Sequence, residues 1–273
     1  MNIYEVKDHA PSLLPDGMEF ELVWADEFDA PELDTNKWDY RLCMMGKRHP
    51  SWTDKGVTFE NSCAVFKIFE EDGEIVTSQL QTGYNFMDQP VESSKFWGQD
   101  LQWPIGRLRD NKFTKRYGYF ECRCRTQQKP GWWSAFWLQS PMIGASKDAK
   151  LAGAEVDVLE SFTPGTINKH TIVTGGYGLD MKYIQTGRQD PISTDEFHTF
   201  GVLWTEDKYV FYIDGEEDGM IDQNVSGVPL FILISAETNG YRFNPKRPTE
   251  EAMAAARAGD TFLVDHVRVF DIK

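Results

Sequence analysis

The sequence predicts an all-β protein, built as a sandwich or a barrel. Much of the 273-residue chain falls into short segments in which apolar and polar side chains alternate, and turn signals separate these segments. Side chains of a strand alternate between its two faces, so a period of two is the pattern of a strand. Chains of about 250 residues often fold this way as one domain. We find no internal repeat and no linker that would divide the chain.

The predicted strands follow one another from residue 20 to the end of the chain. They cover 20–24, 64–69, 74–79, 117–126, 132–139, 154–161, 198–204, 209–214, 230–236 and 261–271. The sequences at 71–73 (EDG) and 205–208 (TEDK) are turn signals that pair the flanking strands as hairpins. We therefore assign residues 1–19 to an N-terminal extension and 20–273 to a single domain. One helix is predicted at 250–258, capped by Thr249 and ended by Gly259.

Charge and hydropathy exclude several classes of protein. Asp and Glu number 43 against 28 Lys and Arg, which gives a net charge of −15. A strongly acidic protein repels phosphate backbones, so nucleic acid is not an expected partner. The longest apolar run, Leu230 to Ile234, is too short to span a membrane. The first residues lack the pattern of a secretion signal, which leaves two locations open: the cytoplasm, or secretion with the signal removed.

The four cysteines do not form a recognisable metal or redox motif. Cys43, Cys63, Cys122 and Cys124 show neither a C-x-x-C pair nor a zinc-like spacing. Cys122 and Cys124 lie two residues apart, on one face of a predicted strand. We interpret them as small buried apolar side chains.

The segment 153–160 (GAEVDVLE) carries the clearest signal for chemistry. In a strand, Glu155 and Asp157 point to one face and the valines to the other. A β-bulge near Leu159 would bring Glu160 to the face of the other two acids. A retaining glycosidase needs such a pair of carboxylates, one to attack the anomeric carbon and one to protonate the leaving oxygen. A solvent-facing strand with alternating acids is the other interpretation of this segment.

Aromatic residues make up 14% of the chain and include nine tryptophans, which must fill a core, a ligand cleft or both. In the predicted strand 132–139, Trp133 and Trp137 point to one face, with Phe136 and Leu138 on the other. Flat aromatic rings stack on sugar rings, and carboxylates bind hydroxyl groups, so the two together predict a sugar-binding surface. The alternative is that these tryptophans belong to the core.

Several segments resemble, in order along the chain, the motifs of glycoside hydrolase family 16. Glu155, Asp157 and Glu160 are similar to the E-x-D-x-x-E catalytic strand of the bulged branch, which includes laminarinases and agarases. The other similar segments are WADEF at 24–28, YGYFECR at 117–123, WSAFWL at 133–138, FHTFG at 197–201, FYIDG at 211–215 and VDHVRV at 264–269. The resemblance covers residues 20–271.

The resemblance implies a β-jelly-roll of two packed antiparallel sheets, concanavalin-like, with a concave glycan cleft. It implies that Glu155 is the nucleophile and Glu160 the general acid/base, and that Asp157 lies between them and tunes Glu155. Retention by double displacement follows from that assignment.

Further residues are assigned from the resemblance by position. Trp103 is expected to be a sugar platform or a packed loop residue, and Asn61 to reach bound sugar, alongside Trp133 and Trp137. No cofactor is expected for catalysis. A structural calcium is expected at Asp265 through its side chain and at Glu27 and Gly73 through backbone carbonyls, because calcium prefers oxygen ligands.

Three functions remain open from the sequence. We expect an endo-acting retaining β-glycanase that cleaves β-1,3 or β-1,3/1,4 bonds of a glucan polysaccharide or oligosaccharide. A β-galactanase of the same family is the alternative, because residues 173–178 read VTGGYG where many relatives carry H-W-D-G-Y-G, which puts the substrate in doubt. A non-catalytic glycan-binding module is the third option, although we expect such a module to have lost one of the three carboxylates. The monosaccharide and the oligomeric state are not predicted.

Overall fold

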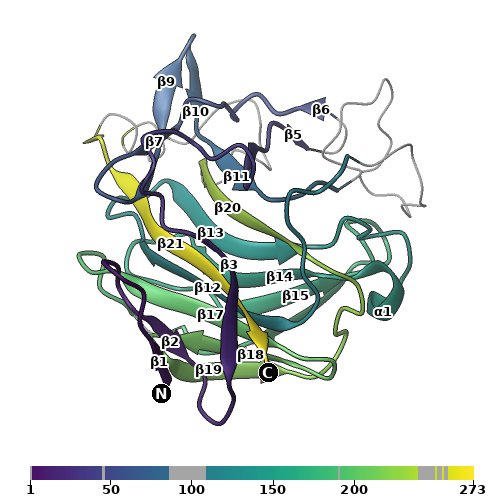
Figure 1. Ribbon diagram of the computed structural model, residues 1–273. Helices are drawn as coiled ribbons and strands as arrows, with labels where there is room; N and C mark the ends of the chain where they lie inside the picture. Colours follow the sequence, from purple (N-terminus) through teal and green to yellow (C-terminus); the bar gives the residue numbers. More distant parts are fainter. Residues whose placement is uncertain are drawn as a thin grey trace.

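The computed structural model describes residues 2–44, 47–85, 109–189, 191–238 and 258–273, together with residues 250 and 254. Two large antiparallel sheets pack face to face (Figure 1). This is the predicted all-β sandwich. The predicted helix 250–258 lies mostly outside the described residues, although Glu250, Ala254 and Ala258 are helical. Within the described part, no helix has the length and apolar character needed to cross a bilayer.

The first sheet has seven strands, all paired antiparallel. Their spatial order is β16 (Lys182–Thr186), β15 (His170–Thr174), β14 (Glu155–Ser161), β13 (Trp132–Gln139), β20 (Phe231–Thr238), β11 (Gln79–Gln81) and β4 (Asp39–Tyr40). The acid-bearing strand β14 and the tryptophan-bearing strand β13 are neighbours near the middle of this sheet.

The second sheet has eight strands. Their order is β19 (Glu216–Ile221), β18 (Tyr209–Ile213), β17 (His198–Trp204), β12 (Gly118–Arg125), β21 (Thr261–Ile272), β8 (Ala64–Lys67) and β7 (Val57–Phe59), with β3 (Phe20–Asp26) also paired to β21. β17 and β18 pair as the predicted hairpin.

The remaining elements are short. They are the hairpins β1 (Asn2–Tyr4)–β2 (Ser12–Leu14), β5 (Cys43–Met44)–β6 (Lys47–Arg48) and β9 (Phe69–Glu71)–β10 (Glu74–Val76), and the helix α1 (Ala149–Ala152). The β9–β10 hairpin forms at the predicted turn, where Asp72 and Gly73 both have positive φ.

One apolar core fills the space between the two sheets. Phe120, Cys122 and Cys124 reach it from β12, and Phe136 and Leu138 reach it from β13. Both cysteines are fully buried and free, which confirms their interpretation as small apolar side chains. Because alternate residues of β13 face this core, the residues between them must face the other side of the sheet.

The N-terminal segment packs on the outer face of the eight-stranded sheet. Leu14 and Phe20 pack there against Tyr119 in a second apolar cluster. The Arg268 guanidinium donates to the Ala10 carbonyl at 2.8 Å. The residues that the sequence assigns to an extension therefore cover a surface of the domain.

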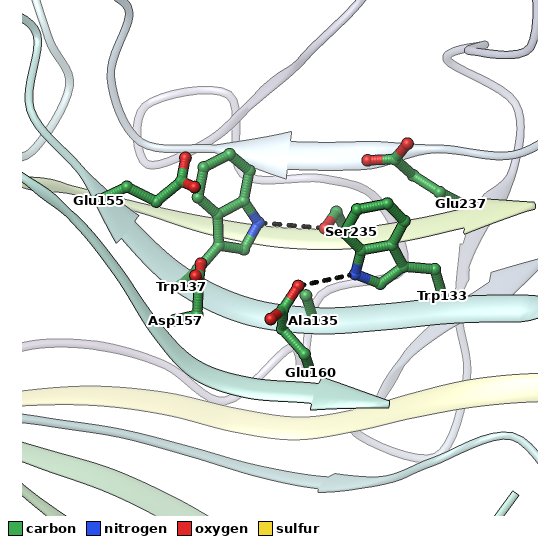
Figure 2. A pocket seen from close by; sticks show the side chains of 8 residues that line it. All are labelled: Trp133, Ala135, Trp137, Glu155, Asp157, Glu160, Ser235 and Glu237. Atoms are coloured by element: carbon green, nitrogen blue, oxygen red, sulfur yellow. Dashed lines mark hydrogen bonds between the residues drawn. The ribbon is translucent and has the colours of Figure 1, made fainter. Parts of the chain in front are cut away.

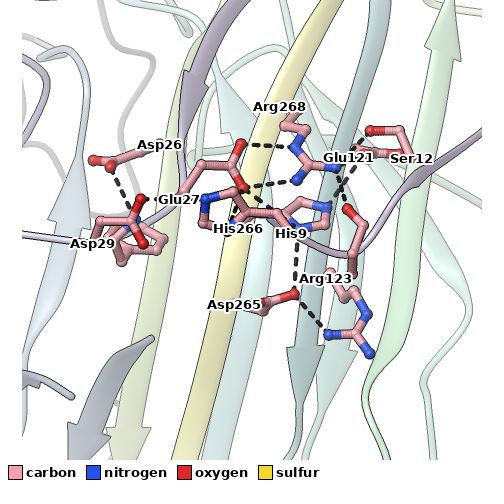
Figure 3. Close-up of polar contacts among 12 residues, drawn as sticks. His9, Ser12, Asp26, Glu27, Asp29, Glu121, Arg123, Asp265, His266 and Arg268 are labelled. Carbon is pink, nitrogen blue, oxygen red and sulfur yellow. Dashed lines mark hydrogen bonds and ion pairs between the residues drawn. The ribbon is translucent and has the colours of Figure 1, made fainter. Parts of the chain in front are cut away.

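This covered face carries a charged group of side chains that we call the outer network. Its members are Glu27, Glu121, Asp265, His266 and Arg268, shown in Figure 3. The side chains of Glu121, His266 and Arg268 are fully buried. Buried charges are tolerated when opposite charges face them, and here acids and bases alternate through the network.

Candidate active site

A β-bulge interrupts β14 at Val158. In the register with β13, Asp157 lies opposite Trp137 and Leu159 lies opposite Phe136, so Val158 has no position of its own on the partner strand. Val158 and Leu159 both pack into the apolar core. The bulge predicted near Leu159 is confirmed.

The bulge brings three carboxylates to one face of the seven-stranded sheet. Glu155, Asp157 and Glu160 line a single pocket (Figure 2). Without the extra residue, the alternation of a strand would turn Glu160 into the core. The valines on the other face anchor the strand, because burying each of them contributes about 1.5–3 kcal/mol.

The two neighbouring strands complete the pocket. The other lining residues are Trp133, Ala135 and Trp137 from β13, and Ser235 and Glu237 from β20. The indole nitrogen of Trp133 donates to Glu160 Oε1 at 3.0 Å, and that of Trp137 donates to Ser235 Oγ at 3.0 Å (Figure 2). These two bonds fix the rings, so the predicted placement of Trp133 and Trp137 beside the acids is observed.

Two neutral donors hold the carboxylate of Glu155. The Gln139 side-chain amide donates to its Oε2 at 3.1 Å, and the Tyr177 hydroxyl donates to the same oxygen. Burial, followed by the adjacent Glu155 carboxylate, raises the pKa of Tyr177 well above its ordinary value. Tyr177 therefore keeps its proton and remains a donor to Glu155.

The sequence did not identify Tyr177 as part of the site. Gly175 and Gly176 precede it with φ of +79° and +78°, and a Cβ on Gly175 would lie 2.3 Å from the Asp180 carbonyl oxygen. Only glycine fits such a turn without strain. The Gly-Gly pair after a strand was thus the available signal that the chain folds back here toward β14.

Glu237 is the fourth carboxylate of the pocket, and the sequence also missed it. The predicted strand ended at Ala236, whereas β20 continues to Thr238. Glu237 pairs in register with Trp133 and shares the face of Ser235. The alternation of side chains continues for two residues past Ala236, so a longer predicted strand would have included Glu237.

A buried arginine lies against one of the pocket tryptophans. The guanidinium carbon of Arg41 is 5.2 Å from the centre of the Trp137 ring and 5.1 Å from that of Trp52. Arg41 also donates to Gln79 Oε1 at 3.3 Å. No pattern in the sequence singled out this residue, because its partners come from distant strands.

Two predicted sugar-binding residues do not join this group. Asn61 lies in the two-residue turn of the β7–β8 hairpin, where it and Ser62 have φ of 53° and 55°. It is exposed on the eight-stranded sheet and is not among the described residues that line the pocket, so its sugar-binding role stays a prediction. Its positive φ shows why an Asn is suited to this position. Trp103 lies outside the described residues.

Two of the three residues expected to hold calcium have side chains that contact arginines. Arg268 donates to both carboxylate oxygens of Glu27, at 2.8 and 2.7 Å, and Arg123 donates to Asp265 at 2.6 Å (Figure 3). Gly73 belongs to the β9–β10 turn. Calcium takes several oxygen ligands. No cluster of three His, Cys, Asp or Glu suited to a metal occurs in the described residues. The expected site also used the backbone carbonyls of Glu27 and Gly73, so the calcium assignment stays a prediction.

A pocket lined by carboxylates and tryptophans, on one sheet of a β-sandwich, is the arrangement expected of a glycoside hydrolase. Residues 21–272 match the family model described as "Beta-porphyranase A-D, GH16 domain". The chain belongs to glycoside hydrolase family 16.

Known proteins with different substrates resemble this chain. Glucan endo-1,3-beta-glucosidase A1 of Niallia circulans is 24% identical over 71% of this chain and 28% of its own length. Kappa-carrageenase of Pseudoalteromonas carrageenovora is 30% identical over 72% of this chain and 50% of its own length. The chain thus spans only part of these relatives.

The fold of the sandwich matches solved structures. The catalytic domain of an endo-1,3-beta-glucanase (laminarinase) from Thermotoga petrophila RKU-1 superposes with a TM-score of 0.64 and 20% identity, over 94% of this chain and all of that one. The predicted jelly-roll fold is confirmed.

Proposed function

We propose that this protein is an endo-acting retaining glycanase that hydrolyses internal β-glycosidic bonds of a galactan. The observation that carries the proposal is the bulge at Val158, which brings Glu155, Asp157 and Glu160 to one pocket. The strands that bear this pocket are interior to the sheet, with further strands on both sides of it. Cleavage within a chain is proposed from the endo-acting glycanases among the relatives.

Glu155 and Glu160 are assigned to the two halves of a double displacement. In the first step, a Glu155 oxygen attacks the anomeric carbon, the glycosidic bond breaks, and the departing oxygen takes a proton from Glu160. In the second step, water attacks the same carbon, Glu155 leaves, and Glu160 recovers a proton from that water. Asp157 lies between them on the strand and is assigned the role of tuning Glu155.

The surrounding donors support this division of roles. Tyr177 and Gln139 fix the Glu155 oxygen with neutral hydrogen bonds, which orient the carboxylate and leave its charge in place. The Trp133 indole does the same for Glu160 at 3.0 Å. A carboxylate oriented in this way needs little reorganisation when the sugar arrives, and such preorganisation is a major source of catalysis.

A galactan is favoured over a glucan by the match of the whole domain to the porphyranase model. The kappa-carrageenase supports this choice at 30% identity. A β-1,3 or β-1,3/1,4 glucan is the second candidate, supported by the relatives that are named as glucanases. Arg41 places a positive charge against Trp137, so galactans with anionic substituents belong among the test substrates.

Release of reducing ends from a panel of polysaccharides tests the proposal. The panel contains porphyran, κ-carrageenan, agarose, laminarin and mixed-linkage β-glucan, with the Glu155→Gln variant beside the wild type. Glu216→Gln is the matched control, because Glu216 is exposed on β19 of the other sheet. We expect activity on a galactan in the wild type and the control, and none in Glu155→Gln. Activity on the glucans alone would contradict the galactan proposal and favour a β-glucan as the substrate.

Azide added to alanine variants separates the two carboxylate roles. In Glu155→Ala, azide would attack the anomeric carbon directly and give the α-glycosyl azide. In Glu160→Ala, azide would attack the glycosyl-enzyme and give the β-glycosyl azide. The reverse pair of products would exchange the two assignments.

A further inference from the structure

The catalytic strand has a polar contact on its buried side. His170, on β15, has a ring that is 1% exposed and stacks on Phe211 of the other sheet, with ring centres 4.4 Å apart and planes 5° from parallel. Its Nδ1 lies 2.8 Å from the carbonyl oxygen of Val158. Val158 is the bulge residue itself, so the contact is made where the strand departs from regular pairing.

Because of the bulge, Val158 is not paired with a residue of either neighbouring strand. Pairing of β14 with β13 passes from Asp157 to Leu159, and pairing with β15 ends at Asp157 opposite Thr171. A buried carbonyl without a hydrogen bond costs about 1–3 kcal/mol. The His170 ring supplies the donor that neither neighbouring strand supplies.

Both nitrogens of the His170 ring face groups that accept hydrogen bonds. A carbonyl oxygen only accepts, so Nδ1 beside Val158 must carry a hydrogen. Nε2 lies 3.1 Å from Oδ2 of Asp218, on β19. The ring therefore links the bulge of the catalytic strand to an acid of the second sheet.

The groups around this ring hold it in place. The contact with His170 outweighs burial and lowers the pKa of Asp218 to about 2, so this acid is ionised. The Arg188 backbone N–H also donates to Asp218 at 3.0 Å. The other face of the contact is the Phe211 ring, which stacks on the imidazole.

We propose that His170 is a positioning residue that fixes the β-bulge of the catalytic strand and, through its contact with Asp218, links it to the second sheet. The bulge sets the direction of Glu160 relative to Glu155, so loss of the Nδ1 hydrogen bond would let the two acids move apart. The catalytic part of this proposal depends on the proposed function, whereas the contact does not. A displacement of about 1 Å in a catalytic group can cost about 100-fold in rate.

Nitrogen NMR of the ring tests the contact directly. In protein labelled with ¹⁵N-histidine, we expect Nδ1 of His170 to carry a hydrogen, because it donates to the Val158 carbonyl. The signal is assigned by its absence from His170→Asn. A bare Nδ1 would overturn the proposal. Because this readout needs no substrate, it is distinguishable from a failure of the proposed function.

Two substitutions separate the proposed positioning role of His170 from simple core packing. An Asn amide nitrogen can take the place of Nδ1, whereas a Gln amide nitrogen reaches the place of Nε2. We expect His170→Asn to keep kcat within a few-fold of wild type, and His170→Gln to lose about 10- to 100-fold in kcat with KM unchanged. Equal losses in both variants, or an unchanged kcat in His170→Gln, would show that the residue only fills the core.

Discussion

The carboxylates of the pocket and those of the outer network have opposite surroundings. In the outer network, Glu27 accepts two hydrogen bonds from Arg268, and Asp265 accepts one from Arg123. In the pocket, by contrast, Glu155 accepts from an amide and a phenol, and Glu160 accepts from an indole. Within the described residues, the first region pairs its acids with arginines, whereas these three donors to the pocket acids are neutral.

The difference shows how one sandwich uses acids for two purposes. An ion pair with arginine stabilises the charged carboxylate and keeps it from exchanging a proton, which suits a structural role. A neutral hydrogen bond fixes the direction of a carboxylate but leaves it able to attack carbon or transfer a proton, as double displacement requires. The predictions below separate activity from stability at these two sites.

Glu155→Gln should give the largest effect, and only on activity. The amide cannot attack the anomeric carbon, so we expect kcat to fall by at least about 10⁴-fold. Sugar binding should be largely retained, and the midpoint of urea unfolding should hardly change. Kinetics on the best galactan and calorimetric titration of oligosaccharide check both parts. A variant with near-normal activity would contradict the nucleophile assignment.

Arg268→Met should show the opposite pattern. Removing the arginine leaves Glu27 and the fully buried Glu121 without this partner. Breaking a buried ion pair in this way costs about 3–5 kcal/mol in the free energy of unfolding. Urea denaturation measures the loss, and kcat of the folded fraction should stay near wild type. An unchanged stability would show that the outer network is not a structural cluster.

Tyr177→Phe should give a smaller effect, again on activity. It removes one hydroxyl donor from Glu155 and keeps the ring in place. A hydrogen bond to a charged group contributes about 1.5–3 kcal/mol, which corresponds to roughly 10- to 100-fold in kcat. Steady-state kinetics measures kcat. The control is Tyr183→Phe, because Tyr183 is an exposed tyrosine on β16. Equal kcat values in the two variants would remove Tyr177 from the catalytic group.

His266 should make the stability of the outer network depend on pH, with the smallest effect of the four. Burial alone would lower the pKa of His266, but Asp265 and Glu121 outweigh burial and raise it. A group with a raised pKa contributes its full stability below the unfolded value of about 6.5 and loses it as the pH rises through the folded value. We expect the free energy of unfolding to fall over that range in the wild type. His266→Gln should flatten this dependence, and an unflattened curve would contradict the assignment.

Local patterns in the sequence predicted the strands of the site and three of its four acids. The bounds of β13 and β17 were predicted to the residue, and the bulge in β14 followed from the spacing of Glu155 and Glu160. These features depend on neighbours along one strand. Alternation of side chains is a local property, which a sequence displays directly.

Features that depend on contacts between distant segments could not be predicted in this way. Tyr177 reaches Glu155 from a turn after another strand, and Arg268 meets Glu27 across more than two hundred residues of sequence. The assignments of Asn61 and of calcium rest on position along the chain alone. The partners that would decide each case come from elsewhere in the fold, so both stay predictions.

The configuration of the first product tests the central claim most directly. Proton NMR, recorded within the first turnovers on the galactan that the protein cleaves, shows which anomer forms before mutarotation mixes the two. A pocket in which Glu155 attacks carbon and Glu160 transfers the proton predicts that the β-anomer appears first. Early appearance of the α-anomer would mean a single displacement by water, which would contradict the assignment of these two residues.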